Sequence, residues 1–422
     1  MFQPDEAFAR ELDAADPLAR FRDQFHLPRR PDGAPALYFC THSLGLSPRA
    51  ARSFVDQELT RWADLGVEGH FQGDPPWYTY QDSLRPPLAR LVGARPGEVI
   101  LMNGLTVNLH LLLETFYRPT DERHAILLDS PPFPSDLYAV KSQLARHGRD
   151  PSRALLTVRP RAGEYRLRHE DIEERLETHG HEIAVVVWNA VNFLTGQFFD
   201  VPSLVAAAKR QGCVVGLDLA HAVGNVPLAL HDWGVDFAVW CTYKYLCAGP
   251  GAVAACFVHE SHGKNTSLPR LAGWWGNDPS QRFRMQLEPD FQAKAGADGW
   301  QISNPSVLAA APLRASLALY EESGLPALRA RSQKLTAYLE YLLERLPPGR
   351  VEIITPRDPE RRGCQLSLRV REGARELLKA LVGEGVFADF REPDVIRAAP
   401  APLYNTFHEV WALAQAFARH VV

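Results

Sequence analysis

The middle of the chain is dominated by short, uninterrupted runs of apolar residues. The runs that we expect to form strands lie at 125–129, 183–188, 213–218, 237–241 and 252–257. Between them, the segments 134–147 and 202–211 have the periodicity of amphipathic helices. Strands that are apolar on both faces and alternate with helices are typical of a parallel sheet covered on both sides. The pattern therefore predicts an α/β domain with a mainly parallel sheet flanked by helices.

The pattern changes toward both ends of the chain. Residues 1–47 predict an arm with one amphipathic helix and a loop rich in proline and arginine. We expect the remaining helices at about 48–66, 80–93, 104–117, 306–347 (broken near Gly324), 373–384 and 405–420, with further strands near 351–355 and 365–370. These elements predict a large domain over 48–305 and a smaller α+β C-terminal domain over 306–422, with the arm packed against the smaller one.

Composition and charge narrow the classes of function. The chain has 422 residues, of which 46% are hydrophobic and 23% charged, and a formal net charge of −4. It lacks the basic face that nucleic acid or an anionic membrane would need, so we expect neither partner. No signal-peptide pattern is visible and no apolar run approaches the ~20 residues of a membrane span, so we expect a cytoplasmic protein. The six cysteines are irregularly spaced, which favours reduced, buried thiols.

Polar residues follow the predicted strands, at the sheet edge where ligands bind in open α/β folds. Asp218 ends one strand shortly before His221, and Tyr243 and Lys244 follow another strand. A carboxylate there is costly to bury without a partner, which a protonated pyridine nitrogen would supply; a capped turn is the alternative. Lys244 lies in an aromatic stretch, where a lysine either extends to solvent or is desolvated and forms a Schiff base.

A predicted helix that begins after Gly104 offers a phosphate site. Free backbone N–H groups and the hydroxyl of Thr106 can bind phosphate at such a start, although Thr106 can also be a simple N-cap. Together with Lys244 and Asp218, this helix start predicts pyridoxal 5′-phosphate (PLP) as the cofactor.

Several other motifs are missing from the sequence. No GxGxxG, Walker A or GxSxG pattern stands in the required context, which argues against a nucleotide fingerprint and a hydrolase elbow. His179 and His181 lie in a polar loop, and no histidine pair has a carboxylate at metal-ligand spacing, so we expect no metal site.

At this point the sequence resembles a known family. The segments that carry the resemblance run in order along nearly the whole chain: YFCTHSLGLSP (38–48), GLTVNLHLL (104–112), FPSDLYA (133–139), TGQFFDVP (195–202), DLAHAVGNVPL (218–228), CTYKYLCAGPG (241–251), LAGWWG (271–276), QISNPSVL (301–308) and APLYNTFHEV (401–410). They are similar to the kynureninases. The resemblance implies PLP fold type I, related to aminotransferase class V, with the large domain binding PLP.

The resemblance also implies an activity and an assembly. The reaction would be hydrolysis of L-kynurenine or 3-hydroxy-L-kynurenine to the corresponding anthranilate and L-alanine, in tryptophan degradation and NAD biosynthesis. The enzyme would be a homodimer with active sites shared between subunits.

The resemblance assigns a role to each matching residue. Lys244 would be the Schiff-base lysine and move the α-proton, with Tyr243 and Asp218 as the other catalytic residues. The cofactor-binding residues would be Leu105, Thr106, Phe133, Asp136, Asn189, Asp218, His221, Tyr243 and Lys244, with Trp274 and Asn304 of the partner subunit. The substrate-binding residues would be Arg397, which would pair with the carboxylate, His42, His70, Ser303 and Asn304.

Three positions depart from the family pattern. His42 stands in a segment that usually reads GNSLGL, Pro132 precedes FPSD, and Asn189 replaces a residue that is often serine or threonine. The pattern of His70, Ser303 and Asn304 resembles members that favour the 3-hydroxy substrate, since a polar pocket can hydrogen-bond the ring hydroxyl.

Other classes of protein stay open on the sequence. Another fold-type-I enzyme, such as an aminotransferase or a cysteine desulfurase, is the main alternative. A desulfurase would need a mobile catalytic cysteine, and Cys364 precedes a predicted strand. A non-catalytic binding protein on the same scaffold is a third class, against which the intact Lys244, Asp218, Tyr243 and Arg397 argue.

Overall fold

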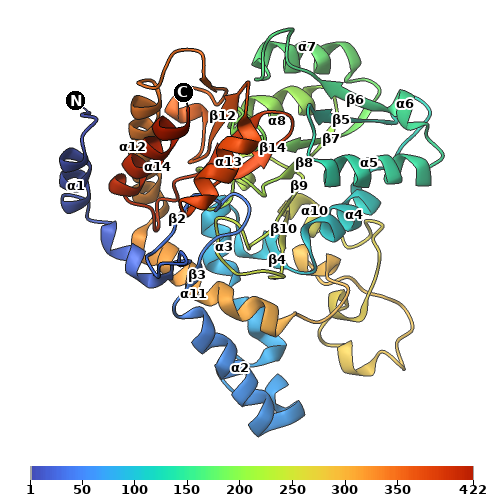
Figure 1. The fold of residues 1–422 in the computed structure, drawn as a ribbon. Coiled ribbons are helices and arrows are strands. Elements are labelled where there is room, and N and C mark those ends of the chain that lie inside the picture. Colours follow the sequence, from blue (N-terminus) through green and yellow to red (C-terminus); the bar gives the residue numbers. More distant parts are fainter. Residues whose placement is uncertain (1, 422) are drawn as a thin grey trace.

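The computed structural model describes residues 2–421 and is built around one large sheet. Within these residues the sheet has seven strands in the order β4-β10-β9-β8-β7-β5-β6 (Figure 1). The strands are β4 (Val99–Leu101), β5 (Ala125–Asp129), β6 (Leu155–Val158), β7 (Ile183–Asn189), β8 (Val214–Asp218), β9 (Phe237–Trp240) and β10 (Ala255–Val258). The strands from β6 to β9 in this order are parallel, while β10 runs antiparallel to both of its neighbours.

The predicted mainly parallel sheet is therefore confirmed, with two corrections. The run at 252–257 forms a strand three residues later than its apolar start suggests, and this strand is antiparallel. The strands β4 and β6 were not predicted, because each has only three or four residues and neither stands out from its surroundings.

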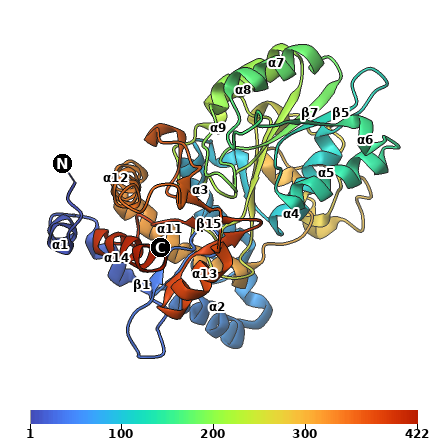
Figure 2. The same ribbon diagram turned by 45° about the horizontal axis from the view of Figure 1, so that its top comes forward.

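Helices cover both faces of the large sheet. The helices of the chain are α1 (Glu6–Ala14), α2 (Ala51–Leu65), α3 (Arg85–Val92), α4 (Leu105–Phe116), α5 (Pro134–Arg146), α6 (Pro151–Ala154), α7 (His169–His179), α8 (Val201–Arg210), α9 (Leu230–Trp233), α10 (Glu260–Gly263), α11 (Val307–Ser323), α12 (Leu325–Leu343), α13 (Ala374–Gly383) and α14 (Phe407–His420). Figure 2 shows α8 and α5 on opposite sides of the sheet.

Strand β5 shows how the sequence places apolar side chains on both faces of the large sheet. Its side chains alternate with a period of two. Ala125 and Leu127 join a core cluster with residues of α3, α8 and α11, whereas Ile126 and Leu128 join another with residues of α4 and α5. A run that is apolar at every position is thus required by two separate cores.

A smaller sheet lies in the C-terminal part, in the order β11-β12-β15-β14. Its strands are β11 (Val351–Ile353), β12 (Leu366–Val370), β14 (Asp389–Arg391) and β15 (Val395–Ala398). The last two were not predicted. The predicted break near Gly324 is confirmed, because α11 ends and α12 begins there and Gly324 has a φ of 73°, which glycine adopts easily.

The N-terminal segment packs against the C-terminal one. Helix α1 lies beside α14 (Figure 1), and β2 (Leu37–Tyr38) pairs in parallel with β13 (Val386–Phe387). Helix α11 packs against α2 and contributes to the core of the large sheet, whereas α12 packs against α14. The domain limits 1–47, 48–305 and 306–422 stay a prediction.

The loop after β2 reaches the turn that carries Lys244. The backbone N–H of Gly45 donates to the carbonyl of Tyr243 at 2.8 Å. A Cβ atom at Gly45 would lie 2.3 Å from the Lys244 carbonyl oxygen and 2.5 Å from Cys247 Sγ. This glycine is therefore required by close packing, which explains its place in the HSLGL segment. No helix among residues 2–421 is both long and apolar enough to cross a membrane.

We expect Gly45→Ala to destabilise the protein by about 1–3 kcal/mol or more, because backbone atoms must move to admit the methyl group. The matched control is Gly97→Ala, where a Cβ would meet nothing within 4 Å. Thermal unfolding of both variants measures the difference. Equal melting temperatures for the two would contradict the close packing at Gly45.

Candidate active site

Lys244 is buried at the carboxyl-terminal edge of the large sheet. It follows β9, and His221 follows β8, the neighbouring strand. Lys244 Nζ lies 3.0 Å from His221 Nε2, and 8% of Lys244 is exposed. Burial and the charge of Lys244 hold the pKa of His221 well below its ordinary value, so the imidazole is neutral. Lys244 therefore does not extend to solvent.

Three buried carboxyl groups share this edge of the sheet. Asp129 ends β5, Asp218 ends β8, and Asp136 lies in the first turn of α5. Burial raises the pKa of both Asp136 and Asp218, and for Asp136 the charges of Asp218 and Asp129 raise it further. Asp218 Oδ1 accepts from the backbone N–H of Ala220 at 2.7 Å. Within residues 2–421, neither oxygen of Asp136 has a hydrogen-bond partner.

Two asparagines hold Asp129. Asn189 Nδ2 donates to Asp129 Oδ1 at 3.0 Å, and Asn192 Nδ2 donates to Oδ2 at 2.9 Å. Burial outweighs both contacts and raises the pKa of Asp129 to about 6. Asn189, which the sequence suggested for cofactor binding, is thus engaged with a carboxyl group. Asp129 and Asn192 were missed, although each lies at or just beyond a predicted strand end.

The first turns of α4 and α5 meet near these groups. Thr106 lies directly after Leu105, the first residue of α4, and its Oγ1 lies 2.7 Å from Oγ of Ser135 in α5. Phe133, which precedes α5, has its ring centroid 5.7 Å from Lys244 Nζ. Two helix N-termini with adjacent hydroxyl groups are suited to bind an anion.

Tyr243 neighbours Lys244 in the same turn and is partly buried. Burial raises the pKa of Tyr243, and its neighbour Cys241 raises it further. The phenol is therefore protonated at neutral pH and can donate a proton or a hydrogen bond.

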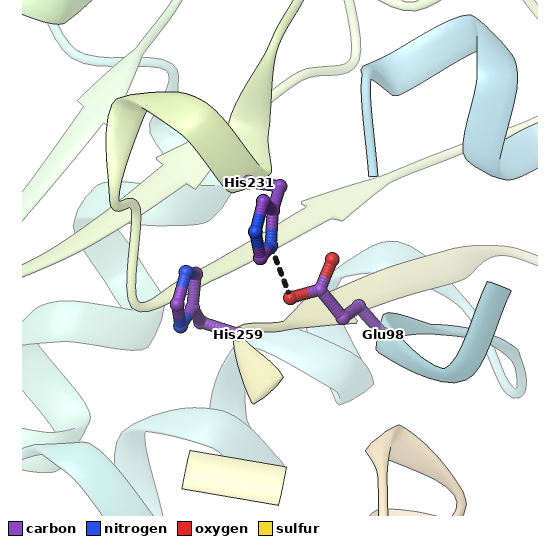
Figure 3. Close-up of side chains that lie close together, drawn as sticks. All are labelled: Glu98, His231 and His259. Carbon is purple, nitrogen blue, oxygen red and sulfur yellow. Dashed lines mark hydrogen bonds and ion pairs between the residues drawn. The ribbon is translucent and has the colours of Figure 1, made fainter. Parts of the chain in front are cut away.

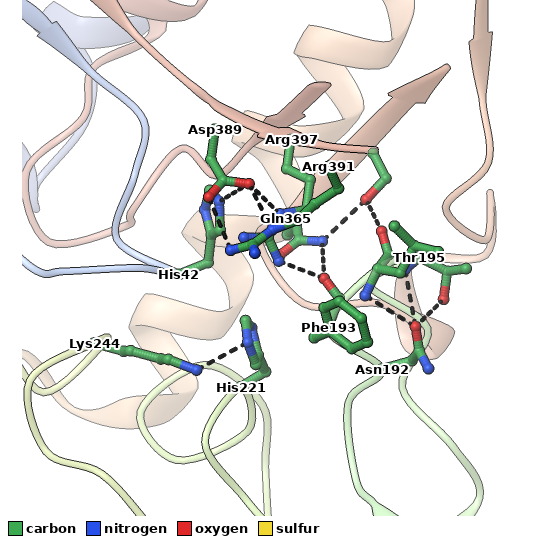
Figure 4. A network of polar contacts seen from close by, with 12 residues as sticks. His42, Asn192, Phe193, Thr195, His221, Lys244, Gln365, Asp389, Arg391 and Arg397 are labelled. Carbon is green, nitrogen blue, oxygen red and sulfur yellow. Dashed lines mark hydrogen bonds and ion pairs between the residues drawn. The ribbon is translucent and has the colours of Figure 1, made fainter. Parts of the chain in front are cut away.

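Arg397 lies on β15 and faces the same region from the smaller sheet (Figure 4). Its Nε donates to Asp389 Oδ1 at 2.7 Å, and its Nη1 donates to the Phe193 carbonyl at 2.6 Å. His42 is buried beside this pair, with Nε2 3.8 Å from Asp389 Oδ1. Burial and the charge of Arg397 lower the pKa of His42 to about 3, so this imidazole is neutral.

The remaining residues that were predicted to bind cofactor or substrate lie away from Lys244 and Arg397 in the structure. His70 and Asn304 line a cavity of about 450 Å³ that Trp62, Trp77 and Trp275 also line. Ser303 is exposed next to Asn304, and Trp274 is 40% exposed. Across residues 2–421, no hydrogen bond, ion pair or ring contact connects these four predicted residues with Lys244 or Arg397.

A second cluster of polar side chains consists of Glu98, His231 and His259 (Figure 3). Glu98 Oε1 contacts His231 Nδ1 and accepts from the backbone N–H of Glu260, each at 2.8 Å. Its Oε2 accepts from the N–H of Arg95 at 2.8 Å. These contacts satisfy the buried carboxylate and tie α9 and α10 to the segment before β4.

The pKa of Asp129 generates a prediction about stability. The folded value of about 6 lies above the ordinary 3.8, so protonation stabilises the fold below about pH 4 and this stability is lost as pH rises through 6. The difference between the folded and the ordinary pKa corresponds to a contribution of about 3 kcal/mol to the free energy of unfolding. We expect the unfolding free energy of cofactor-free wild type, relative to Asp129→Asn, to fall by up to that amount between pH 4 and 7. Chemical denaturation across this range measures it, and a pH-independent difference would contradict it.

Comparison with known proteins gives close full-length relatives. The chain is 54% identical over 420 residues to a kynureninase of Myxococcus xanthus, covering 100% of this chain and 98% of that protein. It is 52% identical over 416 residues to a kynureninase of Koribacter versatilis, covering 99% and 98%. The family model described as the Kynureninase C-terminal domain matches residues 328–417.

Solved structures show the same fold at low sequence identity. A C-DES mutant with glycine covalently linked to its PLP cofactor has a TM-score of 0.79 at 19% identity, covering 94% of this chain and 98% of that one. The cysteine desulfurase CsdA of Escherichia coli has a TM-score of 0.77 at 18% identity, covering 95% and 98%. The fold is PLP fold type I. On its full-length similarity to the curated relatives, the chain belongs to the kynureninase family.

Proposed function

We propose that the chain is a PLP-dependent hydrolase that converts L-kynurenine, or its 3-hydroxy form, to the corresponding anthranilate and L-alanine. The names of its full-length relatives support this activity. The observation in the structure that carries the proposal is the buried Lys244, which contacts His221 and whose charge acts on Asp136 and Asp218.

The residues at this edge fit PLP. A protonated pyridine nitrogen is a donor, and the buried Asp218 would accept from it. Asp136, whose two oxygens have no donor among the residues that the structure describes, would support Asp218 from beside it. The start of α4, with Thr106 and Ser135, offers N–H and hydroxyl donors suited to a phosphate group. Phe133 lies near enough to Lys244 for its ring to pack on the cofactor. Donors and acceptors thus match the two polar ends of PLP.

Each residue then has a defined task in the reaction. Bound PLP withdraws electrons from the bonds at the substrate α-carbon. Asp218 holds the positive charge of the ring nitrogen, and Arg397 binds the substrate carboxylate. With substrate bound, the amine of Lys244 would remove the α-proton, and neutral His221, 3.0 Å from Lys244 Nζ, would accept a hydrogen bond from the resulting ammonium group.

Hydrolysis of the Cβ–Cγ bond needs proton control at the ketone. Water adds to the ketone carbon, and the phenol of Tyr243 donates to the ketone oxygen as negative charge develops there. When the bond breaks, the water oxygen stays in the new carboxyl group of the anthranilate. A proton returns to the β-carbon, which becomes the methyl group of alanine, and Lys244 returns the proton that it removed to the α-carbon.

A desulfurase mechanism lacks its nucleophile in this chain. Cys364 is buried, burial raises its pKa to about 12, and its backbone N–H donates to Asn225 Oδ1 at 2.9 Å. A thiol in this state is neither mobile nor ionised at neutral pH.

We expect Lys244→Ala to lower kcat by about 10³-fold or more, because it removes the base that moves the α-proton. Lys141→Ala, at an exposed position of α5, is the matched control and should keep wild-type activity. Release of anthranilate and alanine from kynurenine is measured by chromatography. A wild-type protein that binds PLP yet releases neither product would overturn the proposal.

We further propose a homodimer in which the partner copy supplies Trp274 and Asn304. A continuous group of aromatic rings lies next to these residues: Phe71 packs on Phe283, Phe283 on Tyr78, and Tyr78 on the buried Trp275. Phe71 and Phe283 are exposed at its outer end. Trp62 and Phe283 are about 60% exposed. Apolar patches of this kind on isolated chains mark protein interfaces. A second copy is the favoured occupant because the Lys244 site of one chain has no contact with Trp274 or Asn304.

Mixing inactive variants tests the shared site. If Asn304→Ala abolishes activity, a mixture of Lys244→Ala and Asn304→Ala chains should regain roughly a quarter of wild-type activity, since random pairing yields hybrids with one intact site. If both residues serve the site of their own chain, no hybrid contains an intact site. Failure to regain activity after exchange of subunits would therefore contradict the proposal.

We also propose a preference for the 3-hydroxy substrate. His70 Nδ1 lies 3.0 Å from the Val67 carbonyl, to which it can only donate, and the His70 ring lines the cavity. In the tautomer with the proton on Nδ1, Nε2 is an acceptor. An acceptor suits a phenolic hydroxyl, and Asn304 lines the same cavity. Sites that hydrogen-bond a hydroxyl discriminate strongly against analogues that lack it.

The ratio of kcat/KM for the two substrates measures this preference. We expect a ratio of about tenfold or more for the 3-hydroxy form, and a ratio near one for His70→Phe, which keeps a ring against Trp77 but removes the acceptor. A wild-type ratio at or below one would contradict the proposed preference for the 3-hydroxy substrate but not the proposed reaction.

A further inference from the structure

Arg397 is oriented by a neighbour that is fixed in register on the same sheet. Strands β14 and β15 are antiparallel, and Asp389 is the direct register partner of Arg397. Directly opposed residues of an antiparallel pair project from the same face, and so does the residue two positions along the strand. Arg391 therefore joins Asp389 and Arg397 on one face. We propose that Asp389 is the positioning residue of Arg397 and that Arg391 keeps this group cationic, so that the three side chains form a preorganised receptor for the substrate α-carboxylate.

The contacts fix the guanidinium from two sides. Asp389 Oδ1 accepts from Arg397 Nε at 2.7 Å, and the Phe193 carbonyl in the loop after β7 accepts from Nη1 at 2.6 Å. Gln365 Nε2 donates to the same carbonyl at 3.1 Å. Arg397 is 1% exposed, and in the described part of the chain its Nη2 has no acceptor. A buried guanidinium nitrogen without an acceptor is costly and indicates that a ligand oxygen belongs there.

Arg391 makes the net charge of this group of side chains positive. A lone Asp389–Arg397 pair would be neutral and would attract a carboxylate weakly. Arg391 donates to Asp389 through Nε at 3.1 Å and through Nη2 at 3.0 Å. Two guanidinium groups and one carboxylate leave a single net positive charge, which matches one α-carboxylate. Figure 4 shows the Asp389 carboxylate in contact with both arginines, with His42 on the side toward Lys244.

This inference rests on the proposed function for the identity of the substrate, but a simpler ligand pair tests it. L-Alanine is the amino acid product, and ethylamine is the same molecule without the carboxylate. Both are titrated into the PLP-loaded protein, and binding is followed by the absorbance of the bound cofactor. KM and kcat for kynurenine are measured on the same preparations.

We expect Asp389→Ala to weaken L-alanine binding by about 10–100-fold, the range for losing a hydrogen bond to a charged group. The Kd for ethylamine should stay within about twofold of wild type, an order-of-magnitude bound set by the absence of any carboxylate contact. KM for kynurenine should rise in parallel with smaller changes in kcat. Asp389→Asn keeps an acceptor oxygen and should restore part of the affinity. Arg391→Gln should weaken L-alanine binding without affecting ethylamine.

The matched control is Asp394→Ala. Asp394 Oδ2 accepts from Arg369 Nε at 2.7 Å, so this variant removes an ion pair of the same geometry from the same sheet. It should leave both affinities unchanged. Equal loss of L-alanine and ethylamine binding in Asp389→Ala, or unchanged L-alanine binding, would overturn the inference. A wild type that binds L-alanine but does not hydrolyse kynurenine would instead overturn the proposed function.

Discussion

Burying ionisable groups together is the constraint on which this structure depends. Lys244, Asp218 and Asp136 are removed from water at one edge of the large sheet, where an isolated charge is costly. The lysine has a neutral imidazole as neighbour. Burial raises the pKa of both carboxyl groups, and the charge of Asp218 raises the pKa of Asp136 further. Such a set is incomplete without a ligand that brings its own positive and negative ends, and PLP has both.

The sheet creates this arrangement through its topology. Parallel strands end at the same edge, so Asp129, Asp218 and the turn with Lys244 meet although up to 115 residues separate them in the sequence. The antiparallel smaller sheet supplies Asp389 and Arg397 from the opposite side. The loop at Phe193 contacts residues from both sheets. The ring of Phe193 contacts Phe133, which follows β5, and the Phe193 carbonyl accepts from Arg397 on β15. The residues proposed to hold cofactor and substrate are therefore joined by one continuous set of contacts.

The sequence predicted the parts that depend on local patterns. The bounds of strand β5, for example, were predicted to the residue because four apolar positions, 125–128, end at Asp129. The polar residues after β8 and β9 indicated the edge of the sheet. The partners of those residues could not be found in this way. Asp389 contacts Arg397 through the register of two short strands, and Asn192 contacts Asp129 across 63 positions, so neither pairing has a local signal. The role of His42 was open on the sequence; the structure places it, neutral and buried, beside Asp389.

In the proposed function, Lys244 is the residue that links PLP to the chain. Reduction of the PLP-loaded protein with borohydride makes that linkage permanent, and peptide mapping by mass spectrometry then locates it. We expect the cofactor on the peptide that contains Lys244, and we expect prior incubation with kynurenine to reduce the amount of labelled peptide. Cofactor on another lysine, or none on the chain after loading, would contradict it.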